Sequence, residues 1–74
     1  MFESAPVSEG LININTAGPE LLDTLPGIGP ELARRIVDYR NTHGAFTAPG
    51  DLLLVDGIGE RTLEDIWDLI TVGG

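Results

Sequence analysis

Apolar residues recur in this chain in a pattern that returns 30 positions later. Four apolar positions of the first half have apolar counterparts in the second half: Leu22 and Leu52, Leu25 and Val55, Ile28 and Ile58, and Ile36 and Ile66. A fixed period of this size is typical of a repeated supersecondary unit. Each unit is predicted to be a short helix, a glycine-rich turn and a second helix.

The proline and apolar positions predict four helices, near residues 19–25, 30–41, 49–55 and 60–70. Pro19 and Pro49 suit the first position of a helix, where the missing N–H costs nothing. The first helix is expected to bury Leu21, Leu22 and Leu25. The last helix has an apolar face at helical spacing, on which Trp67 is expected to be largely buried, made of Leu63, Ile66, Trp67 and Ile70. These elements predict an all-α fold of two pseudo-symmetric helical hairpins.

Both ends of the chain are expected to be irregular. Residues 1–10 are predicted to be a flexible tail and residues 73–74 a frayed end, so the folded domain is expected at 11–72. Ile12 and Ile14 alternate with polar residues in a short extended segment. We expect this segment to lie beside the end of the chain at residues 71–72.

The repeated turns, Gly27-Ile28-Gly29 and Gly57-Ile58-Gly59, are the first candidate site. The first glycine of each turn tolerates positive φ after the preceding helix. The second has no side chain, so a phosphate can approach the backbone. Because the next helix starts at once, its unpaired N–H groups and the positive end of its dipole form an anion site. In the first turn we expect the donors to come from Ile28, Gly29, Glu31 and Leu32, since Pro30 has none.

Three arginines follow these turns closely: Arg34 and Arg35 after the first, and Arg61 after the second. Their position favours phosphate contact. The alternative is that each arginine pairs with an acid one helical turn away, such as Glu31 or Glu64.

The composition excludes several classes of protein and argues against a nucleic-acid binder. The chain of 74 residues contains no cysteine, which excludes disulfides and thiolate metal sites. Its apolar runs are too short to span a membrane, and the first ten residues lack the basic residue of a signal peptide. Twelve acids face four arginines and no lysine, which gives a net charge of −8. Nucleic-acid-binding domains usually have a basic excess instead.

Candidate catalytic residues are few. His43 is the only histidine, and near a helix end it is expected to be a surface residue. Asp65 and Asp68 share a helix face with no nucleophile and no third carboxylate. The sequence therefore predicts no enzyme, metal site or cofactor and no small-molecule substrate.

The chain resembles the C-terminal tandem helix-hairpin-helix domain of the ComEA family, the DNA receptors of bacterial competence. The resemblance covers residues 11–72 and is carried by Ile12-Asn13-Ile14-Asn15-Thr16-Ala17, Leu25-Pro26-Gly27-Ile28-Gly29, Tyr39-Arg40, Asp51-Leu52-Leu53, Gly57-Ile58-Gly59 and Ile70-Thr71-Val72. It implies two hairpins that hold the phosphates of duplex DNA without reading sequence, in an exported protein. The chain departs from the pattern at Asp56 and Glu64, where the family commonly has basic residues.

We therefore expect a monomeric domain that binds double-stranded DNA, for possible use in DNA uptake, with the first hairpin as the stronger contact. The alternative is a protein-interaction module that has the same fold and has lost DNA binding. The net charge favours this alternative, and the arginines after the turns favour DNA. The sequence does not fix the compartment; only the family resemblance implies an extracytoplasmic one.

Overall fold

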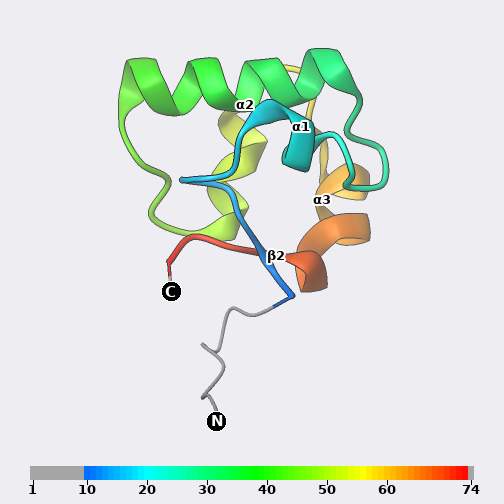
Figure 1. The fold of residues 1–74 in the computed structure, drawn as a ribbon. Helices are drawn as coiled ribbons and strands as arrows, with labels where there is room; N and C mark the ends of the chain where they lie inside the picture. Colours follow the sequence, from blue (N-terminus) through cyan, green and yellow to red (C-terminus); the bar gives the residue numbers. More distant parts are fainter. Residues whose placement is uncertain (1–9, 74) are drawn as a thin grey trace, which may run out of the picture.

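The computed structural model describes residues 10–73 (Figure 1). The elements, in chain order, are β1 (Ile12–Asn13), α1 (Pro19–Leu22), α2 (Pro30–His43), the 3-10 helix η1 (Pro49–Leu54), α3 (Glu60–Ile66), the 3-10 helix η2 (Trp67–Leu69) and β2 (Ile70–Thr71). The all-α prediction of two helical hairpins is confirmed. The predicted tail and frayed end lie outside the described residues, apart from Gly10 and Gly73.

Three helices begin at a proline, as predicted. The helices end at other residues than predicted. Pro19, Pro30 and Pro49 each stand in the first turn of their helix. Helix α1 ends at Leu22 rather than at residue 25, because the following amides bond three residues back, Thr24 N–H to Leu21 and Leu25 N–H to Leu22. The third predicted helix is a 3-10 helix, and the fourth is divided between α3, η2 and β2.

The core repeats with the same 30-residue offset as the sequence. Five pairs of equivalent positions are buried in both halves: Leu22 and Leu52, Leu25 and Val55, Ile28 and Ile58, Ala33 and Leu63, and Ile36 and Ile66. Burial of one such aliphatic side chain contributes about 1.5–3 kcal/mol. Phe46, on the loop between the halves, is also buried. The two hairpins therefore share one continuous core.

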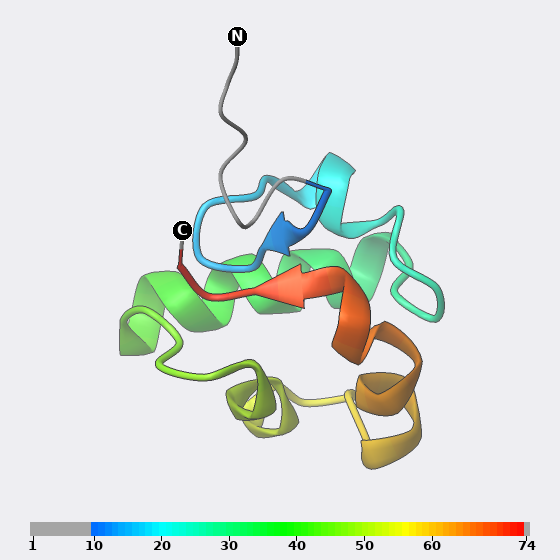
Figure 2. The same cartoon turned by 90° about the horizontal axis from the view of Figure 1, so that it is seen from below.

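The two strands confirm the predicted meeting of the chain ends. β1 and β2 pair in parallel, Ile12 with Ile70 and Asn13 with Thr71 (Figure 2). The Ile14 N–H donates to the Thr71 carbonyl at 2.9 Å. This short ladder joins the first and the last element of the domain.

Asn15 joins three distant segments with its side-chain amide. Its Nδ2 donates to the carbonyls of Phe46 and Val72, both at 2.9 Å, and its Oδ1 accepts from the Phe46 N–H at 2.7 Å. Nearby, Arg40 Nη1 of α2 donates to the Ile14 carbonyl at 2.8 Å. These bonds hold the strand pair and the inter-hairpin loop together.

Two predictions of burial are wrong, those for Leu21 and Trp67. Leu21 is 49% exposed, because a four-residue helix turns only one side, that of Leu22, to the core. Trp67 is 51% exposed. Its equivalent in the first repeat, Val37, is also only partly buried, so this position lies at the edge of the core in both repeats. After Ile66 (φ −112°, ψ 0°) the α-helix also gives way to a 3-10 turn.

Within residues 10–73, no helix has both the length and the apolar character needed to cross a membrane.

Candidate functional site

The two glycine-rich turns have the same hydrogen bonds. The Ile28 N–H donates to the Leu25 carbonyl at 3.0 Å, and the Ile58 N–H donates to the Val55 carbonyl at 3.1 Å. The first glycine of each turn has positive φ, +79° at Gly27 and +96° at Gly57. Only glycine adopts this conformation without strain. The expected positive φ is therefore confirmed.

The first helical hydrogen bond after each turn leaves the preceding amides free. These bonds run from Ala33 N–H to Gly29 and from Leu63 N–H to Gly59. Among the described residues, no protein acceptor bonds the N–H groups of Gly29, Glu31 and Leu32, or of Gly59, Glu60, Arg61 and Thr62. The Ile28 N–H is engaged within its turn, which removes it from the expected donors. Glu60 and Thr62 were missed, although Thr62 stands 30 residues after Leu32 and Glu60 has the N–H that its equivalent Pro30 lacks.

The four glycines of the turns have different surroundings. A Cβ on Gly27 would lie 3.6 Å from Thr62 Cγ2, and one on Gly57 would lie 2.7 Å from Leu32 Cδ2. Since residues 32 and 62 are equivalent, each turn packs on the first turn of the opposite hairpin's second helix. A Cβ on Gly29 or Gly59 would meet no atom within 4 Å. Each second glycine, whose own N–H is one of the free amides, thus has open space beside its Cα.

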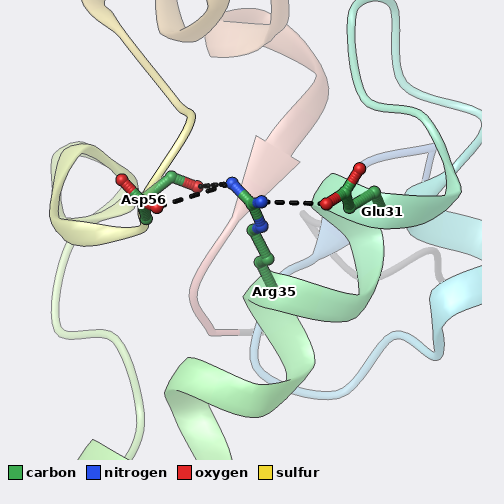
Figure 3. Close-up of polar contacts among 3 residues, drawn as sticks. All are labelled: Glu31, Arg35 and Asp56. Carbon is green, nitrogen blue, oxygen red and sulfur yellow. Dashed lines mark hydrogen bonds and ion pairs between the residues drawn. The ribbon is translucent and has the colours of Figure 1, made fainter.

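The predicted arginines have three different environments. Arg35 Nη2 bonds Glu31 Oε2 at 2.9 Å, while its Nη1 donates to the Asp56 carbonyl at 3.1 Å and lies 3.6 Å from Asp56 Oδ2 (Figure 3). Arg61 Nε lies 3.6 Å from Asp65 Oδ1. Arg34 is exposed and has no ion pair with any described residue. The alternative of pairing one turn away is therefore realised at Arg35 and Arg61, and Arg34 is the available cation.

The two hairpins carry opposite charges at equivalent positions. The pair Glu31–Arg35 of α2 corresponds to Arg61–Asp65 of α3, with the signs exchanged. Outside these pairs, Arg34 corresponds to Glu64. Residues 26–38 contain two acids and two arginines, whereas residues 56–68 contain five acids and one arginine. The first hairpin is thus neutral and the second has a net charge of −4.

The described residues contain no cluster of candidate metal ligands, and His43 lies at the other end of α2 from the first glycine-rich turn. Residues 10–73 contain no group of three histidine, aspartate or glutamate side chains that could hold a metal ion. The ring of His43 stacks on Tyr39 with centroids 4.1 Å apart, and His43 Nδ1 lies 3.3 Å from the Tyr39 carbonyl. His43 therefore packs on the exposed end of α2.

The structure groups the predicted site residues at two places. Gly27, Gly29, Glu31, Leu32 and Arg34 surround the start of α2, and Gly57, Gly59 and Arg61 surround the start of α3. Ile28 and Ile58 are buried plugs of the turns. Arg35 lies between the two places and holds the second turn. The sequence missed this bridge because its partners are 21 positions apart.

Comparison with known proteins agrees with this architecture. The helix-hairpin-helix motif family model matches residues 7–71. The chain is 45% identical over 62 residues to ComE operon protein 1 of Bacillus subtilis, covering 84% of this chain and 30% of that protein. An uncharacterized protein of Haemophilus influenzae is 49% identical over 67 residues, covering 89% of this chain and 59% of that protein.

A relative from animals has a much longer chain. Human endonuclease/exonuclease/phosphatase family domain-containing protein 1 is 45% identical over 65 residues, which are 88% of this chain and 11% of that protein. The chain thus spans a small part of this relative. The match to the Bacillus protein confirms the expected ComEA resemblance. Since the family model covers nearly all the described residues, the chain belongs to the helix-hairpin-helix family.

Proposed function

We propose that this chain is a non-enzymatic domain that binds double-stranded DNA through its phosphates, with the first hairpin as the main contact. The observation that carries the proposal is the open start of α2. There, unbonded amides, a glycine that faces empty space and an unpaired arginine occur together. Helix N-termini of this kind bind anions through N–H groups and the helix dipole.

Arg34 adds a charged contact to these amides. It stands four residues after Pro30, which is about 6 Å along the helix axis. An arginine side chain is long enough to span that distance, so a phosphate at the start of α2 lies within its reach. A guanidinium–phosphate bond is roughly twice as strong as a bond between neutral groups. The first hairpin therefore combines backbone donors with one free positive charge.

The second hairpin has comparable backbone donors in a less favourable field. Its net charge of −4 comes from carboxylates such as Glu60 and Glu64, which follow the turn closely and lie near these amides. Each carboxylate near the surface repels an approaching phosphate by about 1 kcal/mol at low salt. We assign this hairpin a minor share of the binding energy.

Family membership and the match to ComE operon protein 1 support DNA binding as the general function. A place in DNA uptake, outside the cytoplasm, follows from the ComEA resemblance and belongs to the proposal. The enzymatic class in the name of the human relative refers to a protein of which this chain spans 11%. We propose no catalytic role for the chain.

Fluorescence anisotropy with labelled duplexes of unrelated sequence tests the proposal. We expect equal affinities for all duplexes at low salt, because phosphate contacts carry no sequence information. Affinity should fall as salt rises, with each phosphate contact contributing about −0.9 to the slope of log K against log salt. Absence of binding at low salt, or a strong preference for one sequence, would contradict the proposal.

A further inference from the structure

The only tryptophan of the chain lines a hollow on the outer side of α3 and η2. The hollow has a volume of about 460 Å³ and is lined by Glu60, Leu63, Glu64, Trp67 and Asp68. Half of the Trp67 surface is exposed there. A half-exposed indole beside a hollow is typical of a contact surface, because tryptophan is enriched at protein interfaces.

The charges around this hollow define what can occupy it. Three of the five lining residues, Glu60, Glu64 and Asp68, are carboxylates, and none is basic. These three make no ion pair and no side-chain hydrogen bond with any residue of the described part of the chain. Glu60 and Glu64 lie one turn apart on α3, Asp68 follows on η2, and all three line the hollow as one row of carboxylates. Such a row attracts a cation and repels phosphate.

The apolar lining narrows the choice further. Leu63 and Trp67 stand three and seven residues after Glu60, on the same side of the helix as the carboxylate row. A guanidinium or ammonium over the Trp67 ring gains a cation–π contact as well as the attraction of the carboxylates. An aliphatic side chain beside that cation can cover the apolar lining. The matching partner is a peptide segment with an arginine or lysine next to an apolar residue.

We propose that the hollow at Trp67 binds an arginine- or lysine-bearing segment of a partner protein. This surface is separate from the open start of α2, so the domain can hold DNA at its first hairpin and a basic protein segment on its second. Binding of a basic segment would explain the negative charge of the second hairpin, which DNA binding alone does not explain.

The intrinsic fluorescence of Trp67 reports directly on this site. The probe is the blocked peptide acetyl-Gly-Arg-Leu-Arg-Gly-amide, and its control has citrulline, a neutral isostere, in place of arginine. We expect a saturable change in Trp67 emission with the arginine peptide and none with the citrulline peptide. No DNA is present, so failure of this test leaves the DNA proposal unaffected.

Matched charge variants separate the hollow from general attraction to an acidic domain. Glu64→Gln with Asp68→Asn should weaken peptide binding about tenfold or more. Glu20→Gln with Asp23→Asn removes the same charge from exposed positions at α1 and should change the affinity less than twofold. The inference is overturned if the arginine peptide produces no saturable change, or if both double variants lose affinity equally.

Discussion

Arg35 of the first hairpin donates a hydrogen bond to the main-chain carbonyl of Asp56, in the turn of the second hairpin (Figure 3). The same guanidinium is fixed on its other side by Glu31. One exposed side chain thus ties the second turn to α2. Arg35 was expected from the sequence to contact phosphate, whereas in the structure it joins the two hairpins.

This bridge predicts a coupling between Arg35 and Gly57. A Cβ on Gly57 would lie 2.7 Å from Leu32 Cδ2 and 2.9 Å from Arg35 Nη1, whereas a Cβ on Gly27 has only an ordinary contact. Both substitutions by alanine carry the strain of positive φ, about 1–2 kcal/mol. Gly57→Ala should cost about 1 kcal/mol or more beyond Gly27→Ala, because it displaces Leu32 and also moves Arg35 away from Asp56.

Urea denaturation of a double-mutant cycle measures the coupling. In an Arg35→Ala background, the gap between Gly57→Ala and Gly27→Ala should narrow, because only the contact with Leu32 remains. Arg34→Ala is the matched single variant and should change the free energy of unfolding by less than about 0.5 kcal/mol. A gap of unchanged size without Arg35 would show that the bridge does not contribute to the difference.

Asn15 should be intolerant of a carboxylate. Asn15→Asp replaces two N–H donors by an acceptor that faces the carbonyls of Phe46 and Val72. Because these groups are partly buried, we expect a loss of about 2–3 kcal/mol in the free energy of unfolding. Asn41→Asp, at an exposed position of α2, is the control with the same charge change. Equal stability of the two variants in thermal or urea unfolding would contradict the bracing role of Asn15.

Asp51 gives the domain a specific dependence on acid. Hydrogen bonds from the Thr47 hydroxyl, at 2.8 Å, and from the Thr47 N–H, at 3.0 Å, lower the pKa of Asp51 below its ordinary value of 3.8. A lowered pKa in the folded state contributes stability above the unfolded value, and this contribution is lost as the pH falls through the folded value. The parent should therefore lose more stability than Asp51→Asn between about pH 5 and pH 3.

The comparison requires a variant that removes an equal charge. Asp38→Asn does so at an exposed position with no hydrogen bond to another described side chain. Unfolding curves measured at several pH values should follow the parent for Asp38→Asn and should be flatter in acid for Asp51→Asn. Identical acid profiles for the two variants would rule out the contribution of the Thr47 contacts.

Arg34 and Glu64 have opposite charges at equivalent positions of the two hairpins, and this difference should affect DNA affinity. Arg34→Ala removes the unpaired cation, so the slope of log K against log salt should become shallower by about 0.9. Glu64→Ala removes repulsion and should raise the affinity at low salt by a few fold, roughly. Both residues are exposed, so circular dichroism should show unchanged folding. The charge account fails if anisotropy titrations give both variants the parent's affinity and slope.

Most of the fold could be predicted from the 30-residue repeat in the sequence. Leu22, Leu25 and Ile28 are buried with their equivalents 30 residues later, because period and burial follow from the same helical geometry. The alternation at Ile12 and Ile14 also predicted the extended segment that pairs with β2. Trp67 was not predictable in this way, because helical spacing assigns a side of the helix and cannot show how much room the core has there.

The candidate site was predictable in its backbone and less so in its side chains. Glycines at fixed offsets indicate a turn and a helix start, and the structure has both at Gly27 and Gly57. The contact of Arg35 with Asp56 depends on how the two hairpins pack, and no local sequence pattern shows this packing. For the same reason the sequence could not distinguish Arg35, which is engaged, from Arg34, which is available.

The most direct test of the account is DNA binding by Gly29→Ala beside Gly59→Ala. Both glycines have extended backbones that alanine adopts, with φ of −91° and −105°, and open space for a Cβ. Each variant should fold, with a loss of about 1 kcal/mol or less for the poorer cap. The N–H of residue 29 is itself one of the free amides, so a new methyl group on this residue should crowd a phosphate bound there.

In anisotropy titrations at low salt, Gly29→Ala should lower the affinity for random-sequence duplex about tenfold or more, while Gly59→Ala should lower it less than twofold. Equal losses in the two variants would show that the hairpins act as a symmetric pair. Parent-like affinity in Gly29→Ala would show that phosphate does not bind at the start of α2.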